Sequence, residues 1–398
     1  MRARKFSALF ICMMISFINF SPIEGNIAMN ISDIAHKNGV PGRIVTSIDG
    51  LRDCTDPALV KMKCDEWLPN APSDGDYGGI TVFLDDGLSV TDWQNLESGF
   101  YGMSIDIIGY LTPDDQGNIP DTLIGGFGQD SLQGITDADL GYLDSDFHAL
   151  GVLSAFGTIA RNAKVLFVNI REKTDLPENT GFLLYDSRMW EWIKNNIGQY
   201  NIRIISTSIN TGYLLAKNQT NTDLLTEIYE QGVFMVAAIG NDAWNDPNRG
   251  HYFPNYHPYV YSIGSIDHET RGNSDDEDYY SVENRYSGFS QACRDGENNF
   301  TLCASYGDEW DVNPAEALDF VMPGNGVPIA FEPTIQQVLL GHVLEFASGT
   351  SYSAPYLAAT ALVAIYGYSQ AYYSVAGSFA YPSVSMIYDF LKENAYSP

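Results

Sequence analysis

The stretch MWEWIKNNIGQYNIRIISTSIN (residues 189–210) joins an amphipathic segment to a short run rich in β-branched residues. Its first half has apolar side chains at helical spacing, and its second half has the composition of a buried strand. The same order returns downstream, where NTDLLTEIYEQG (221–232) begins with a plausible cap and stops at Gly232, a residue type common just after a helix. VFMVAAIGN (233–241) is then a wholly apolar strand of the kind found inside parallel sheets. This alternation predicts an α/β fold with a mostly parallel sheet.

The alternation continues on both sides of this stretch. Further strands are predicted at 79–87, 163–170 and 259–266, and further helices at 147–157, 351–366 and 382–395. We therefore predict one three-layer domain over residues 75–398, in which helices flank a mostly parallel central sheet. Residues 26–74 are an N-terminal extension, with a short propeptide as one interpretation of it.

The N-terminus has the pattern of a targeting segment. Residues 1–25 have a basic start and then a short apolar stretch, which predicts a secretory signal peptide, with an uncleaved anchor as the alternative. No later stretch is long and apolar enough to predict a transmembrane helix. We therefore expect a secreted or periplasmic protein with no membrane partner after cleavage.

Charge and cysteine content limit the possible partners. The formal net charge of the 398-residue chain is −29, which makes nucleic acid and anionic membranes poor partners. Apart from Cys12 in the predicted signal peptide, the cysteines form two local pairs, Cys54 with Cys64 and Cys293 with Cys303. An even count in an exported chain predicts two disulfides, and reduced core thiols are the alternative. No histidine or further cysteine stands near either pair at zinc spacing, so no metal site is predicted there.

Four polar residues stand where predicted strands end or helices begin. Asp85 and Asn241 close strands, and His148 and Ser351 open helices. In parallel α/β sheets the chemistry collects at the carboxyl ends of the strands. A serine becomes a nucleophile when a histidine takes its proton, and a carboxylate then steadies the imidazolium. Each residue also has a structural interpretation, with Ser351 as a helix cap, His148 as a structural histidine and Asn241 as a turn former.

Several short motifs resemble those of the subtilisin-like serine proteases. They are GTSYSAP (349–355), TVFLDDG (81–87), FHALG (147–151) and VAAIGN (236–241), and the chain order Asp, His, Ser is that of subtilisin. The Asp-x-Gly spacing favours Asp85 over its neighbour Asp86 as the triad acid. The resemblance covers roughly residues 76–398.

The resemblance implies a serine endopeptidase with Ser351 as nucleophile, His148 as base and Asp85 as the acid that orients it. The oxyanion hole would combine Asn241 with the Ser351 amide. Peptide or protein substrates would bind along the strand edge and loop formed by Ser208, Ile209, Asn210, Ala238 and Gly240. No cofactor is expected, calcium is possible without an identifiable site, and a monomer is expected.

The sequence also departs from the family pattern. SDFH (145–148) replaces the usual His-Gly-Thr-His, and Asn210 stands where the family has glycine. Residues 97–130 form an unusual insert, which we expect to be a lid or flap. An inactive relative that binds extended peptides is therefore a second hypothesis. The sequence does not favour an esterase of the α/β-hydrolase type, because the Gly-x-Ser-x-Gly motif is absent around Ser351. It does not favour a sedolisin relative either, because sedolisins use acidic residues in place of the histidine, and His148 and Asn241 argue against that.

Overall fold

The computed structural model describes residues 72, 74–114, 118–125, 132, 134–142, 148–171, 186–209, 219–240, 253–255, 257–267, 292–294, 300–302, 319–325, 327–331, 344–347 and 349–395. The predicted signal peptide and nearly all of the N-terminal extension lie outside these residues, so both stay predictions. Among the described residues, no helix combines the length and the apolar character that crossing a membrane requires.

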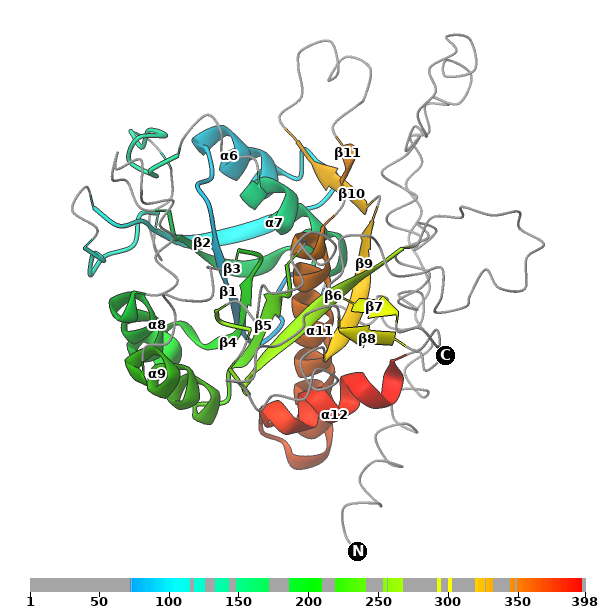
Figure 1. Ribbon diagram of the computed structural model, residues 1–398. Coiled ribbons are helices and arrows are strands. Elements are labelled where there is room, and N and C mark those ends of the chain that lie inside the picture. The colour runs from blue at the N-terminus through cyan, green and yellow to red at the C-terminus, as the bar shows by residue number, and fades with distance from the viewer. Residues whose placement is uncertain are drawn as a thin grey trace, which may run out of the picture.

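A seven-stranded sheet forms the centre of the domain (Figure 1). All six strand pairings are parallel, which confirms the predicted α/β class. In spatial order the strands are β2 (Ile105–Leu111), β3 (Ala163–Asn169), β1 (Ile80–Asp85), β4 (Ile202–Thr207), β5 (Phe234–Ala238), β6 (Val260–Asp267) and β9 (Phe320–Asn325).

Helices cover both faces of the sheet and complete the three predicted layers. One face carries α6 (Val90–Ser98), α7 (His148–Ile159), α11 (Thr350–Ala376) and α12 (Val384–Asn394), and the other carries α8 (Ser187–Tyr200) and α9 (Gln219–Glu230). Strand side chains alternate between faces. Phe83 of β1 therefore packs in the cluster under α7 and α11, whereas Val82 and Leu84 pack in the cluster under α8 and α9.

The α8–β4 unit shows why the local sequence folds in this way. The buried residues of α8 are Met189, Trp190, Ile193 and Ile197, which form one stripe along the helix. Asn201 then takes a left-handed conformation (φ 55°) that ends α8, and β4 begins at the next residue. The hydrophobic spacing and the turn residue thus place β4 beside β1 in the sheet.

The segment 97–130 corrects one expectation. Its residues Ile105–Leu111 form β2, the edge strand that pairs with β3, so the prediction of a lid or flap was wrong for this part. Trp93 of α6 stacks on Tyr110 of β2 with ring centroids 5.7 Å apart, and Tyr110 stacks on Phe167 of β3 at 5.0 Å. This aromatic stack anchors the first part of the segment in the core.

Two small antiparallel pairs accompany the main sheet. One joins β10 (Val327–Ala330) to β11 (Leu344–Ala347), and the other joins β7 (Ala292–Arg294) to β8 (Phe300–Leu302). Cys293 lies in β7, but Cys54, Cys64 and Cys303 lie outside the described residues. Both predicted disulfides therefore stay predictions.

Candidate active site

Asp85 ends β1 at the carboxyl edge of the sheet, between β3 and β4. It lies two residues beyond Phe83, so its side chain faces α7 and α11. The side chain is fully buried, and its Oδ1 atom accepts the backbone N–H of Asp86 at 2.9 Å. Among the described residues the second oxygen, Oδ2, has no hydrogen-bond partner.

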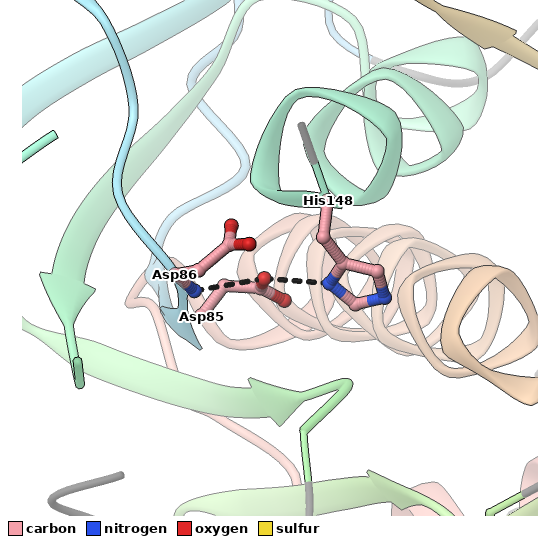
Figure 2. A group of neighbouring side chains, drawn as sticks. All are labelled: Asp85, Asp86 and His148. Carbon is pink, nitrogen blue, oxygen red and sulfur yellow. Dashed lines mark hydrogen bonds and ion pairs between the residues drawn. The ribbon is translucent and has the colours of Figure 1, made fainter. Parts of the chain in front are cut away.

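His148 is the first residue of α7 and lies directly beside Asp85. Its Nδ1 atom is 2.7 Å from Oδ1 of Asp85, and the side chain is 30% exposed. Figure 2 shows the ring with Nδ1 facing Asp85 and the other nitrogen directed away from it. Burial lowers the pKa of the ring, but the charge of Asp85, its hydrogen bond and the charge of Asp86 outweigh that effect and raise the pKa to about 9. The ring therefore holds a proton at neutral pH, which it must lose before it can act as a base.

Ser351 lies in the first turn of α11, beside Ser208, the residue that follows β4. The Ser351 hydroxyl donates to the backbone oxygen of Ser208 at 3.2 Å, and the Ser208 hydroxyl donates to the backbone oxygen of Ser351 at 2.6 Å. The second bond has a cause in the sequence, because Pro355 lies inside α11 four residues after Ser351. Proline has no N–H, so the Ser351 carbonyl lacks its helical donor and Ser208 supplies one.

The starts of α7 and α11 pack against each other. The ring of Tyr352 lies 6.0 Å from the ring of His148, centroid to centroid. A Cβ atom on Gly151 would come within 3.0 Å of Cε1 of Tyr352, so the glycine of FHALG makes room for this contact. Among the described residues, however, the structure gives no hydrogen bond between the Ser351 hydroxyl and His148. Asp85 and His148 are joined, and Ser351 is held nearby on a different partner.

The predicted substrate-binding residues that are described lie on both sides of the first turn of α11. Ser208 and Ile209 continue the chain beyond β4, where Thr207 Oγ1 donates to the Ile209 carbonyl at 2.8 Å. Ala238 ends β5, and the N–H of Gly240 donates to Oγ1 of Thr350 at 3.2 Å. Asn210 and the predicted oxyanion donor Asn241 lie outside the described residues.

The same cluster contains the atoms that a metal ion would use. Asp85, Asp86 and His148 place three ligand-type atoms within 4.8 Å of one another. Two of these groups already have protein partners: Nδ1 of His148 is bonded to Oδ1 of Asp85 at 2.7 Å, and the side chain of Asp86 accepts the Ala149 N–H at 2.9 Å.

Sequence reasoning missed two features of the site. The sequence presents Asp86 as a rival of Asp85, whereas in the structure its carboxylate accepts the backbone N–H of Ala149 at the start of α7. Its position directly after Asp85 in the sequence was the available signal. The pairing of Ser208 with the carbonyl of Ser351 was also missed, although Pro355 indicates that this carbonyl needs an external donor.

A family comparison agrees with this geometry and with the motifs. The model of the subtilase family, Peptidase_S8, matches residues 138–377, which is more than half of the chain. The chain belongs to the subtilase family. Subtilases are serine proteases, so membership implies peptide or protein substrates for this subtilase.

A solved structure agrees at the level of the fold. The subtilase is similar to a structure described as "Crystal Structure of a Lanthipeptide Protease", with a TM-score of 0.53, 15% sequence identity and coverage of 87% of this chain and 89% of the other. A second structure, described as "S41 Psychrophilic Protease", has a TM-score of 0.49, 14% identity and coverage of 79% and 82%. The comparison with curated proteins gave no match.

Proposed function

We propose that this subtilase is a serine endopeptidase that hydrolyses peptide bonds through an acyl-enzyme on Ser351. His148 would serve as the general base and Asp85 as the acid behind it. One observation carries the proposal, namely the 2.7 Å contact between Nδ1 of His148 and the buried carboxylate of Asp85, next to the helix that starts with Thr350 and Ser351. Once it has lost the proton that it holds at neutral pH, an imidazole placed in this way has its second nitrogen available to accept a proton from an alcohol.

In the first step the Ser351 hydroxyl would turn from the Ser208 carbonyl toward Nε2 of His148. The ring takes the proton while the serine oxygen attacks the peptide carbonyl, and Asp85 stabilises the imidazolium that forms. The oxyanion would be bound by the Ser351 N–H in the first turn of α11, where backbone amides favour negative charge. Asn241 is the proposed second donor.

In the second step His148 returns its proton to the leaving amine, the C–N bond breaks, and an ester on Ser351 remains. Water then attacks the ester, with His148 again as the base, and the acid product leaves. The peptide would lie as an added strand along residues 208–210, because backbone pairing of this kind holds a substrate extended. Ala238 and Gly240 would line the opposite side.

A second candidate function is binding of extended peptides without cleavage. The observation that favours it is the hydrogen bond of the Ser351 hydroxyl to Ser208 in place of His148. The altered sequence before His148, SDFH, points in the same direction. Under this hypothesis the groove would bind peptides while Ser351 stayed on Ser208.

The decisive experiment compares the full chain with Ser351→Ala. We expect a fluorophosphonate probe to label the wild-type chain on Ser351, and a mixture of quenched fluorescent peptides to be cleaved, with both signals lost in Ser351→Ala. Circular dichroism checks that both proteins are folded. A folded wild-type chain that binds peptides but is neither labelled nor active would favour the binding function.

We further propose that the chain is exported to a secreted or periplasmic location and works as a monomer without a cofactor. Residues 1–25 would be removed, and disulfides would join Cys54 to Cys64 and Cys293 to Cys303. The intact mass of the exported protein tests the removal of residues 1–25. The same measurement after thiol alkylation, with and without prior reduction, tests the two disulfides. Alkylation of these cysteines without reduction would contradict the disulfides, and loss of activity with EDTA would contradict the absence of a metal requirement.

A further inference from the structure

Asp86 follows Asp85 in the chain and makes a separate contact with α7. Its side chain is buried, and its Oδ1 atom accepts the backbone N–H of Ala149 at 2.9 Å. Ala149 is the second residue of α7, directly after His148. The two consecutive acids therefore hold two consecutive residues of this helix, one through the imidazole and one through the backbone.

The start of a helix needs such a partner. The first backbone N–H groups have no acceptor within the helix, and a side chain just before the helix usually supplies one. In α8 the acceptor is local, because Asp186 receives the N–H of Arg188 at 2.9 Å. Before α7 the sequence has Phe147, whose side chain contains no acceptor. Asp86 supplies the acceptor from the end of β1.

We propose that Asp86 is a positioning residue, which fixes the start of α7 to the end of β1 and so sets the ring of His148 against Asp85. The catalytic consequence rests on the function proposed above. The structural consequence, the placement of the ring, does not depend on it.

The charge of Asp86 adds a second effect. A carboxylate oxygen of Asp86 and a ring nitrogen of His148 lie within 4.8 Å of each other. The titratable groups that face this ring in the described structure are Asp85 and Asp86 from the end of β1 and Tyr352 from α11. Asp86 thus acts on His148 in two ways. Its oxygen accepts the Ala149 N–H and so positions the start of α7, and its negative charge favours the protonated ring.

Two substitutions separate these effects. Asp86→Asn keeps an oxygen that can accept the Ala149 N–H but removes the charge, whereas Asp86→Ala removes both. We expect Asp86→Asn to keep kcat within about threefold and to shift the rising limb of the pH profile about one pH unit lower, the scale of one nearby charge. We expect Asp86→Ala to show the same direction of shift and a further loss of kcat of about 10²-fold at little change in KM, because small misplacements of catalytic groups are costly.

The experiment uses the full chain with two readouts. NMR titration of the His148 ring is measured in the Ser351→Ala background, which prevents self-cleavage, and kcat and KM are measured against pH in the active chain. Asp186→Asn is the matched control, since it alters an acid at the start of another helix and should change neither readout.

The proposal is overturned if Asp86→Ala keeps the kcat of Asp86→Asn, because loss of the acceptor atom would then not disturb the ring of His148. Should Asp86→Ala fail to fold, Asp86→Val, which likewise has neither an acceptor atom nor a charge, takes its place. If the wild-type chain proves inactive, the proposed function fails by itself, and the NMR arm still tests the role of Asp86.

Discussion

The starts of α7 and α11 offer the same kind of position to two different groups. His148 and Ser351 each lie in the first turn of a helix on one face of the sheet. His148 is bonded to Asp85, the partner that the proposed mechanism requires, whereas Ser351 is bonded to Ser208, a partner that the proposed mechanism does not use. Under the proposed function, the acid–base half of the site would be assembled without substrate, whereas the Ser351 hydroxyl would have to leave the Ser208 carbonyl before it could reach His148.

Burial and charge explain the difference. Asp85 is fully buried and charged, and leaving such a group without a partner is expensive, so its bond to the imidazole is strongly favoured. Ser351 is neutral, and exchanging one hydrogen-bond acceptor for another changes its free energy by only about 1 kcal/mol. A bound peptide that competes for the Ser208 carbonyl would be enough to redirect the hydroxyl.

The largest expected effect comes from the assembled half. Asp85→Asn removes the charge that holds the ring in its tautomer and should lower kcat about 10⁴-fold. In the wild type, activity should rise with pH through about 9 as the ring loses its proton, and Asp85→Asn should move this rise to lower pH. Steady-state kinetics from pH 6 to 10 measure both. A kcat within tenfold of the wild type would show that the dyad is not the working base.

The next largest effect concerns the hydrogen bond that the Ser208 hydroxyl donates to the Ser351 carbonyl. Ser208→Ala leaves the carbonyl of Ser351 without a donor and should lower the free energy of unfolding by about 2 kcal/mol. In the Pro355→Ala background the restored backbone N–H can reach the same carbonyl, so Ser208→Ala should cost less there. Urea unfolding of the four proteins in this double-mutant cycle measures the difference. Equal costs in both backgrounds would disprove the link between Pro355 and Ser208.

A smaller effect tests the packing of Tyr352 in α11 against the start of α7. Gly151→Ala places a Cβ atom 2.9 Å from Cδ1 of Ile329 and 3.0 Å from Cε1 of Tyr352, so Tyr352 must shift beside His148 and Ser351. We expect kcat to fall about tenfold, since the catalytic groups move by a fraction of an ångström. Gly198→Ala in α8 is the control, because its Cβ atom meets nothing within 4 Å. Unchanged kinetics in both variants would mean that Tyr352 does not couple the two helices.

The smallest effect concerns a second histidine, His257, which is buried. Burial lowers the pKa of His257, partly offset by its hydrogen bond to the Thr222 carbonyl. Below about pH 6.5 the unfolded chain gains a proton at His257 that the folded chain resists, so stability falls as the pH falls. At pH 5.5, one unit below the usual histidine pKa of about 6.5, the loss of stability should be at most about 1.4 kcal/mol. Urea unfolding at pH 7.5 and 5.5 should show a smaller pH effect in His257→Gln, and an unchanged one would contradict this assignment.

Much of the fold followed from the sequence because its signals are local. The stripe of α8 and the apolar run of β5 are fixed by side-chain spacing, and both elements lie where the pattern predicted them. β2 was missed because a strand inside an apparent insert is recognisable by its pairing with β3, which is a long-range contact. In the site, the motifs indicated Asp85, His148 and Ser351. The contacts of Asp86 and Ser208 depend on distances between elements, which spacing alone does not determine.

The most direct test of the account is the rate at which a fluorophosphonate labels Ser351 as a function of pH. If His148 is the base, the label should be found on Ser351, its rate should rise with a midpoint at about pH 9, and His148→Ala should abolish the rise. Labelling of the folded chain at the same rate with and without His148, or no labelling at any pH, would contradict the account.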